Sequence, residues 1–352
     1  MSFFAEIFFR KRSVRMTAVQ TDTTKSLMVD FVRKPMIMPA VAAATFALVY
    51  FTPARAAELS QAAVDGFNRY AQLTEERIND QTRRGQFLWV DTLAAGQRDA
   101  AYARLRQGEV LEEKLETRDN GRTIEMPDSM IHHWVSVVFV SGVNLGGVKA
   151  FLQEYDNQYR YYRPDIVRSK LLSRQGDDFK IYLRMYKKKV VTVVLNTNHD
   201  VHYKQLDAKH LISTSYATRI AEVENPGTPK EHELPVGNDR GFLWRLNSYW
   251  RAEEKDGGVY VQCEAVTLTR DIPLGLKWLV GPFVNSAPKE FLYNMMTNLR
   301  AGAKTTAARS TGAASTSKKL SAFVQPGQAS QQPWSLSWQV AGITASILQP
   351  LT

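Results

Sequence analysis

The spacing of the hydrophobic positions divides the chain into a helical part and a strand-rich part. Between Leu59 and Asp80, apolar residues recur every three or four positions, which is the period of an amphipathic helix. A shorter helix is predicted from Asp99 to Arg106. From Ile131 onward, apolar and polar residues alternate, which is the period of a strand with one buried face.

The alternation predicts seven strands, most of them separated by turn residues. They cover residues 131–140, 166–173, 179–186, 190–203, 211–223, 242–252 and 259–269. The last two strands are joined by Lys255-Asp256-Gly257-Gly258, which predicts a hairpin. Asn225-Pro226-Gly227 opens a polar loop that runs to Arg240.

Three helices are predicted among and after the strands. Asn144 is expected to cap a short helix, and residues 156–162 form another. A longer helix runs from Pro273 to about Leu299 and is regular after Pro288. The whole pattern predicts an α+β fold, in which a curved seven-stranded antiparallel sheet grips a long C-terminal helix and an N-terminal helical section packs on the outside.

Residues 1–56 are interpreted as a targeting segment. Arg33-Lys34 precedes an apolar run of 16 residues, Met36–Phe51, and Ala54 and Ala56 follow it. These are the three parts of a secretory signal. As a helix the run would be about 24 Å long, shorter than the roughly 30 Å core of a membrane. We therefore expect a cleaved signal and a periplasmic protein of a bacterium, and an uncleaved membrane anchor over 36–51 is the alternative.

The net charge belongs to the two ends of the chain. The formal charge of the 352 residues is +10, whereas residues 57–300 hold 33 basic and 32 acidic residues. A nucleic-acid binder carries its charge as a patch on the folded domain, so nucleic acid is not an expected partner. Residues 303–352 are rich in Ala, Ser, Thr and Gly and are expected to form a disordered tail. Cys263 is the only cysteine, which excludes an intrachain disulfide.

Four stretches of the strand-rich part are distinctive. They read KKKVVTVVLNT (187–197), GFLWRLNSYWR (241–251), GGVYVQCEAVTLTRDIP (257–273) and GLKWLVGPFVNSAPKE (275–290). Together with the order of the predicted elements, they resemble the START/Bet v 1-like (SRPBCC, helix-grip) superfamily, and within it a bacterial subgroup of exported START-like proteins.

The resemblance covers roughly residues 125–302 and implies a START-like domain over 126–302, on which the helical section 57–125 packs. It also implies a hydrophobic cavity between the concave face of the sheet and the C-terminal helix. Members of the superfamily use this cavity for lipids, sterols and other apolar molecules, and some relatives are cyclases or hydrolases. An apolar cavity is also the default ligand site on physical grounds.

Polar residues on the strands are candidate anchors for the head of a ligand. Arg245 and Glu264 are predicted to be cross-strand partners, and Asn247 shares the face of Arg245. If this face lines the cavity, the pair offers one charged anchor; the alternative is an exposed pair on the convex face, which contributes little. Tyr182 and Arg184 share a strand face and have the same two interpretations.

Four apolar residues of the C-terminal segment are candidate pocket walls: Trp278, Leu279, Phe283 and Phe291. Plain core packing is their alternative role. No metal is expected at His199-Asp200-Val201-His202, because residues three apart on a strand point to opposite faces. His132 and His133 are adjacent on a strand, so their rings are expected to point to opposite faces. One of them is expected to be a hydrogen-bonded core histidine. Lys187-Lys188-Lys189 is expected to be a solvated corner, with contact to anionic lipid head groups as the alternative.

The sequence thus predicts an exported protein that binds an apolar ligand, such as a lipid, a sterol or hopanoid, or an isoprenoid, with lipid transfer and transient membrane contact as further expectations. No cofactor, no metal and no catalytic residue is predicted. One alternative is an enzyme of the cyclase or hydrolase type, in which Arg245 and Glu264 act as polarising and acid/base groups; a raised pKa of Glu264 would favour it. Another is a structural module of the cell envelope with a closed core.

Overall fold

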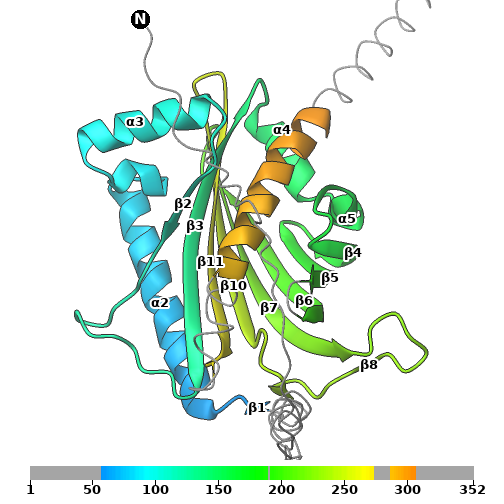
Figure 1. Ribbon diagram of the computed structural model, residues 1–352. Coiled ribbons are helices and arrows are strands. Elements are labelled where there is room, and N and C mark those ends of the chain that lie inside the picture. Colours follow the sequence, from blue (N-terminus) through cyan, green and yellow to red (C-terminus); the bar gives the residue numbers. More distant parts are fainter. Residues whose placement is uncertain (1–56, 189–190, 273–285, 307–352) are drawn as a thin grey trace, which may run out of the picture. The chain divides into compact units, whose positions relative to one another are not determined.

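The computed structural model describes residues 57–188, 191–272 and 286–306 (Figure 1). The predictions made for the targeting segment and for nearly all of the tail lie outside these residues. So do the predicted start of the last helix and three of its candidate wall residues, Trp278, Leu279 and Phe283. Everything below concerns the described residues.

One antiparallel sheet forms the centre of the fold (Figure 1). Its strands lie in the order β2-β3-β11-β10-β7-β6-β5-β4. Their bounds are Leu111–Lys114 for β2, Ser129–Ser141 for β3, Ile166–Gln175 for β4, Asp178–Lys188 for β5, Thr192–Gln205 for β6, His210–Glu224 for β7, Arg245–Lys255 for β10 and Gly258–Arg270 for β11.

All seven predicted strands are present, and the prediction missed only short ones. Strand β2 pairs with the edge of β3, and β8 (His232–Glu233) pairs with β7. A separate two-stranded ladder joins β1 (Ala57–Glu58) to β9 (Asn238–Asp239). These strands have two to four residues, too few to show an alternating pattern.

The β10–β11 hairpin has the turn that its sequence predicts. Lys255 pairs with Gly258, which leaves Asp256 and Gly257 as a two-residue loop. Both have positive φ, 56° and 75°, as a type I′ turn requires and as Asp-Gly readily adopts. This turn fixes which residues of the two strands lie opposite each other, and hence which side of the sheet each side chain faces.

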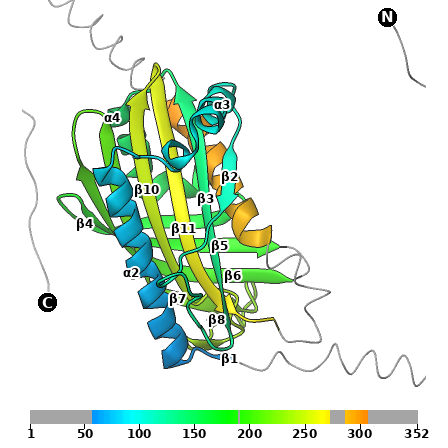
Figure 2. The same cartoon turned by 90° about the vertical axis from the view of Figure 1, so that its left-hand side faces the viewer.

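Two helices cover the convex face of the sheet (Figure 2). Helix α2 (Gln61–Arg83) begins at Ser60, whose hydroxyl accepts a hydrogen bond from the Ala63 N–H at 3.2 Å. Its apolar side packs on Tyr249, Val266 and Leu268. The 3₁₀ turn η1 (Trp89–Thr92) leads to α3 (Ala95–Arg106), which packs near the far end of β3 and β11. Both helices of the N-terminal section therefore pack on the convex face of the sheet.

The concave face is covered by the C-terminal helix, residues 286–306, with α4 (Leu145–Leu152), η2 (Tyr155–Asn157) and α5 (Gln158–Tyr161) beside it. Asn144 caps α4 as predicted, accepting a hydrogen bond from the Gly147 N–H at 2.8 Å. A Cβ at Gly302 would lie 2.4 Å from the Phe151 ring, so glycine allows the C-terminal helix to approach α4 closely. The α+β prediction of a curved antiparallel sheet gripping a C-terminal helix is confirmed.

Candidate ligand-binding cavity

A cavity of about 510 Å³ lies between the concave face of the sheet and the C-terminal helix. Most of its wall is apolar and comes from β4, β5, β6, β10 and the helix. Representative wall residues are Ile166, Ile181, Leu183, Leu195, Val201, Leu246, Trp250, Phe291, Leu292 and Met295. Pockets for one small organic ligand typically measure about 300–1,000 Å³, so this cavity holds a single molecule of that size.

The pleat of the strands decides which residues reach the cavity. Leu246, Ser248 and Trp250 alternate along β10 and all line it. On β11 their partners across the hairpin are Thr267, Ala265 and Cys263, which line it as well. The residues between them point to the opposite face of the sheet.

The outer end of the cavity carries charged side chains that are already paired. Lys187 of β5 lies 3.1 Å from an oxygen of Asp165, whose other oxygen accepts a hydrogen bond from Asn294 of the C-terminal helix at 2.9 Å. Lys187 is also 3.7 Å from Glu290 on that helix. Arg240, on the other side of this end, forms ion pairs with Glu222 and Glu224. The polar contacts of Asp165 and Lys187 therefore tie the helix to the sheet.

Two buried histidines contribute neutral polar groups. His132 contacts the Thr269 hydroxyl at 3.1 Å, and the Nε2 atom of His199 lies 2.9 Å from the Thr197 hydroxyl. Burial lowers the pKa of both imidazoles to about 4, with a smaller contribution from Lys114 at His132. Both rings are therefore uncharged at neutral pH.

Tyrosines gather at the inner end of the cavity. The hydroxyls of Tyr155 and Tyr203 are 2.7 Å apart, and Tyr203 donates to the Leu152 carbonyl at 3.3 Å. Tyr162 lines the same end and is only 4% exposed. Burial raises the pKa of all three phenols, which keeps them protonated.

The structure corrects the predicted charged anchor. Arg245 lies opposite Leu268, and Glu264 lies opposite Tyr249, so the two are not cross-strand partners. They share the convex face with Asn247, on the side of the sheet away from the cavity. The anchor prediction failed because the register of the hairpin turns both side chains away from the cavity. On the convex face Glu264 is covered by α2 and has buried charged partners.

Tyr182 and Arg184 also lie on the convex face. The Tyr182 hydroxyl donates to Asn196 at 2.7 Å, and Arg184 forms an ion pair with Glu231 at 3.0 Å. The intervening residue of β5, Leu183, is the one that lines the cavity. Of the predicted contact residues that the structure describes, Phe291 is the one placed at the cavity wall.

Within each of the two pairs, the histidines point to opposite faces of the sheet, as predicted. His132 faces the cavity, whereas His133 faces α2 and contacts the Tyr70 hydroxyl at 2.9 Å. His199 lines the cavity, whereas His202 is exposed and contacts Asp178 at 2.7 Å. In the described ranges, no three His, Cys, Asp or Glu side chains come together as a possible metal site.

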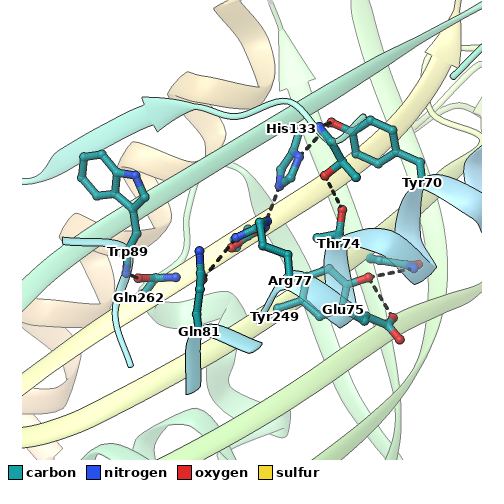
Figure 3. Close-up of polar contacts among 12 residues, drawn as sticks. Tyr70, Thr74, Glu75, Arg77, Gln81, Trp89, His133, Tyr249 and Gln262 are labelled. Carbon is teal, nitrogen blue, oxygen red and sulfur yellow. Dashed lines mark hydrogen bonds and ion pairs between the residues drawn. The ribbon is translucent and has the colours of Figure 1, made fainter. Parts of the chain in front are cut away.

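Beneath α2 lies a buried cluster of charged residues that the sequence did not predict (Figure 3). The Glu264 carboxylate, fully buried, contacts His133 at 2.8 Å and Arg251 at 3.3 Å and forms an ion pair with Arg77 of α2. Burial alone would raise the pKa of Glu264. The hydrogen bond from His133 and the charges of His133, Arg77 and Arg251 outweigh burial and lower the pKa to about 2.

Further hydrogen bonds extend this contact along α2. Glu75 accepts from the hydroxyls of Tyr216 and Tyr249, each at 2.9 Å, and Figure 3 shows Glu75 and Tyr249 facing each other. Thr74 and Thr117 hydroxyls are 2.8 Å apart. These contacts come from one side of α2, at helical spacing. The only signal in the sequence was the polar residues on that side of the predicted helix.

Comparison with known proteins gives structural similarities only. No protein family and no curated protein matches the sequence. A STAR-related lipid transfer protein from Xanthomonas axonopodis is 16% identical, with a TM-score of 0.34 over 54% of this chain and 98% of that one. Human STARD10 is 14% identical, with a TM-score of 0.33 over 59% and 81%. The Zhui aromatase/cyclase from Streptomyces sp. R1128 is 12% identical, with a TM-score of 0.31 over 50% and 94%.

Proposed function

We propose that this protein binds one apolar small molecule or lipid in the cavity between its sheet and its C-terminal helix. The observation that carries the proposal is the cavity itself, about 510 Å³ in volume with a mostly apolar wall. A core packed to the usual density leaves few voids larger than a water molecule, so an apolar space of this size calls for an occupant.

The binding energy would come from burial of the apolar surface of the ligand. Burial contributes about 25 cal/mol per Å², so a ligand burying roughly 300 Å² gains about 7 kcal/mol before the entropic cost of binding. The neutral hydroxyls and imidazoles of the wall would orient it. Because the gain grows with the apolar area buried, a ligand that fills the cavity is favoured over a smaller one.

Exchange of the ligand is proposed to involve a movement at the outer end of the cavity. The C-terminal helix is tied there by Asp165, Lys187 and Asn294. The loop from residue 225 to 240 is the other candidate for movement. We propose that one of these segments opens when the ligand exchanges, and transfer of a lipid between membranes would use the same movement.

Export to the periplasm is part of this proposal and rests on the signal-like segment of residues 1–56. Within the part of the chain that the structure describes, no helix is both long and apolar enough to cross a membrane. We also propose transient contact with a membrane during lipid exchange.

The enzyme alternative loses its two proposed catalytic groups. Arg245 and Glu264 do not line the cavity, and the pKa of Glu264 is lowered rather than raised. A structural module with a closed core is the other alternative, and an open cavity of this size speaks against it.

The proposal is tested by isolating the full chain from a native-like host without detergent and identifying what it releases on denaturation by mass spectrometry. We expect one apolar compound at close to one molecule per chain. An empty protein that also takes up no lipid from phospholipid vesicles would contradict the proposal.

A further inference from the structure

We infer that the ligand carries an uncharged head group, a hydroxyl or a carbonyl, and that the Tyr162 hydroxyl binds this group at the inner end of the cavity. The inference rests on the proposed function and names the chemical class of its ligand.

The first observation is an unused hydrogen-bonding group. Tyr162 follows α5, lines the cavity and is 4% exposed. Its ring packs at a centroid distance of 6.2 Å from that of Phe151. Its hydroxyl makes no hydrogen bond to any residue within 57–188, 191–272 or 286–306, whereas the neighbouring hydroxyls of Tyr155 and Tyr203 bind each other. The Tyr162 hydroxyl lies at the cavity wall without a partner among these residues, which leaves it available to a group that the cavity receives.

The second observation is the charge of the groups around it. The polar side chains of the inner wall include the hydroxyls of Tyr155 and Tyr203, and His199, whose imidazole stays neutral, lies farther along the same wall. Burial raises the pKa of Tyr162, so its hydroxyl keeps a proton to donate. An anionic head group placed here would be buried without a counter-charge, which is strongly unfavourable.

The third observation concerns two cations at the outer end of the cavity, Lys187 and Arg240. Lys187 is already bound to Asp165 and Arg240 to Glu222 and Glu224, so these cations have carboxylate partners. A carboxylate or phosphate on the ligand would have to displace one of them and leave it unpaired. The arrangement therefore favours a neutral head that points inward and an apolar body that extends along Leu183 and Phe291 toward the outer end.

Three pyrene compounds with the same aromatic body test this inference on the full-length chain at neutral pH. They are 1-pyrenebutanol, its ionised carboxylate 1-pyrenebutyrate, and 1-butylpyrene, which has no head group. Binding is followed by energy transfer from tryptophan. We expect the alcohol to bind about tenfold more tightly than the carboxylate. If the carboxylate binds as tightly as the alcohol, the inference is wrong and the proposed function stands. If none of the three binds, the proposed function fails as well.

A matched pair of variants assigns the role to Tyr162. Tyr162→Phe keeps the ring and removes the hydroxyl, whereas Tyr161→Phe makes the same change at a neighbour that does not line the cavity. We expect Tyr162→Phe to weaken binding of the alcohol by about threefold to tenfold, the effect of one hydrogen bond, and to leave binding of 1-butylpyrene unchanged. Tyr161→Phe is expected to change neither. Equal loss for the alcohol and the hydrocarbon in Tyr162→Phe would show a packing role instead and overturn the assignment.

Discussion

Cys263 and Glu264 are consecutive residues of β11 that face opposite sides of the sheet, one toward the cavity and the other toward α2. The thiol belongs to an apolar wall, and the carboxylate is bound by Arg77, Arg251 and His133. The same strands therefore carry a ligand-binding face and a face that holds the N-terminal helix. Substitutions on the two faces are expected to have separable effects, because one set changes binding and the other changes stability.

Glu264→Ala is expected to lower the free energy of unfolding by about 3–5 kcal/mol, because it leaves the buried Arg251 without its counter-charge. Urea denaturation measures this change. Asp200→Ala is the matched control, since it removes a carboxylate from a solvent-exposed pair with Lys180, and a loss below about 1 kcal/mol is expected. Similar losses of unfolding free energy in the two variants would show that the buried cluster stabilises the protein no more than an exposed ion pair does.

Acid is expected to destabilise the protein in two stages, and the buried histidines act first. His132 and His199 have a pKa of about 4 when folded and near 6.5 when unfolded, so the unfolded chain takes up protons first. Their contribution is full above pH 6.5 and is lost as the pH falls to about 4, at most about 3 kcal/mol for each group. The free energy of unfolding of His132→Gln should depend less on pH in this window. An unchanged slope would contradict the lowered pKa of His132.

Glu264 acts in the second stage. Its pKa is about 2 in the folded protein and near 4.3 when unfolded, so its contribution is present above pH 4.3 and is lost as the pH falls toward 2. The loss is on the order of 3 kcal/mol. In Glu264→Gln, unfolding measured between pH 4.5 and pH 2 should lack this part of the pH dependence, and a slope equal to that of the unmodified chain would rule out the assignment.

Filling the cavity is expected to abolish binding with little loss of stability. Ala265 lies on the cavity wall, so Ala265→Phe places a ring in the space proposed for the ligand. Lys180→Phe adds a ring to an exposed position on the other face and serves as the control. Binding of 1-pyrenebutanol and the denaturation midpoint are measured together. Retained binding in Ala265→Phe would place the ligand elsewhere on the protein.

Weakening the contact between the C-terminal helix and the sheet is expected to speed ligand release. Asp165→Asn removes the charge that holds Lys187 and weakens the contact with Asn294. The dissociation rate of 1-pyrenebutanol, measured by stopped-flow transfer to vesicles, should rise severalfold. Asp177→Asn breaks the exposed pair with Lys149 and is expected to leave the rate unchanged. If both variants release at the original rate, the helix contact at Asp165 does not control access.

Local pattern predicted much of this fold, because the information for it is local. Alternation located all seven long strands, the Asp256-Gly257 pair located the hairpin turn, and Asn144 marked the start of α4. The alternation also separated the two faces of β10 correctly. It could not say which face the cavity takes, since both faces mix apolar and polar residues.

The errors at the site have one physical cause, which is the distance along the chain between interacting residues. Glu264 meets His133 and Arg77, which lie 131 and 187 positions away, so no local pattern connects them. Charged residues on a strand were therefore interpreted as anchors for a ligand. The residues that line the cavity, such as Ser248, Tyr162 and Ile181, carry no distinctive pattern in the sequence and become recognisable only when the sheet and helices bring them together.

The position of Cys263 gives the protein a built-in reporter of occupancy. It is the only thiol of the chain, it is fully buried, and it is one of the residues that line the cavity. Burial raises its pKa well above the usual value, so little thiolate is present at neutral pH and alkylation is slow. Alkylation by a small apolar agent therefore needs a movement of the cavity wall that exposes the sulfur, and a bound ligand is expected to slow it. The modification rate of the unaltered chain, read as a single mass increment, therefore reports whether the cavity is filled.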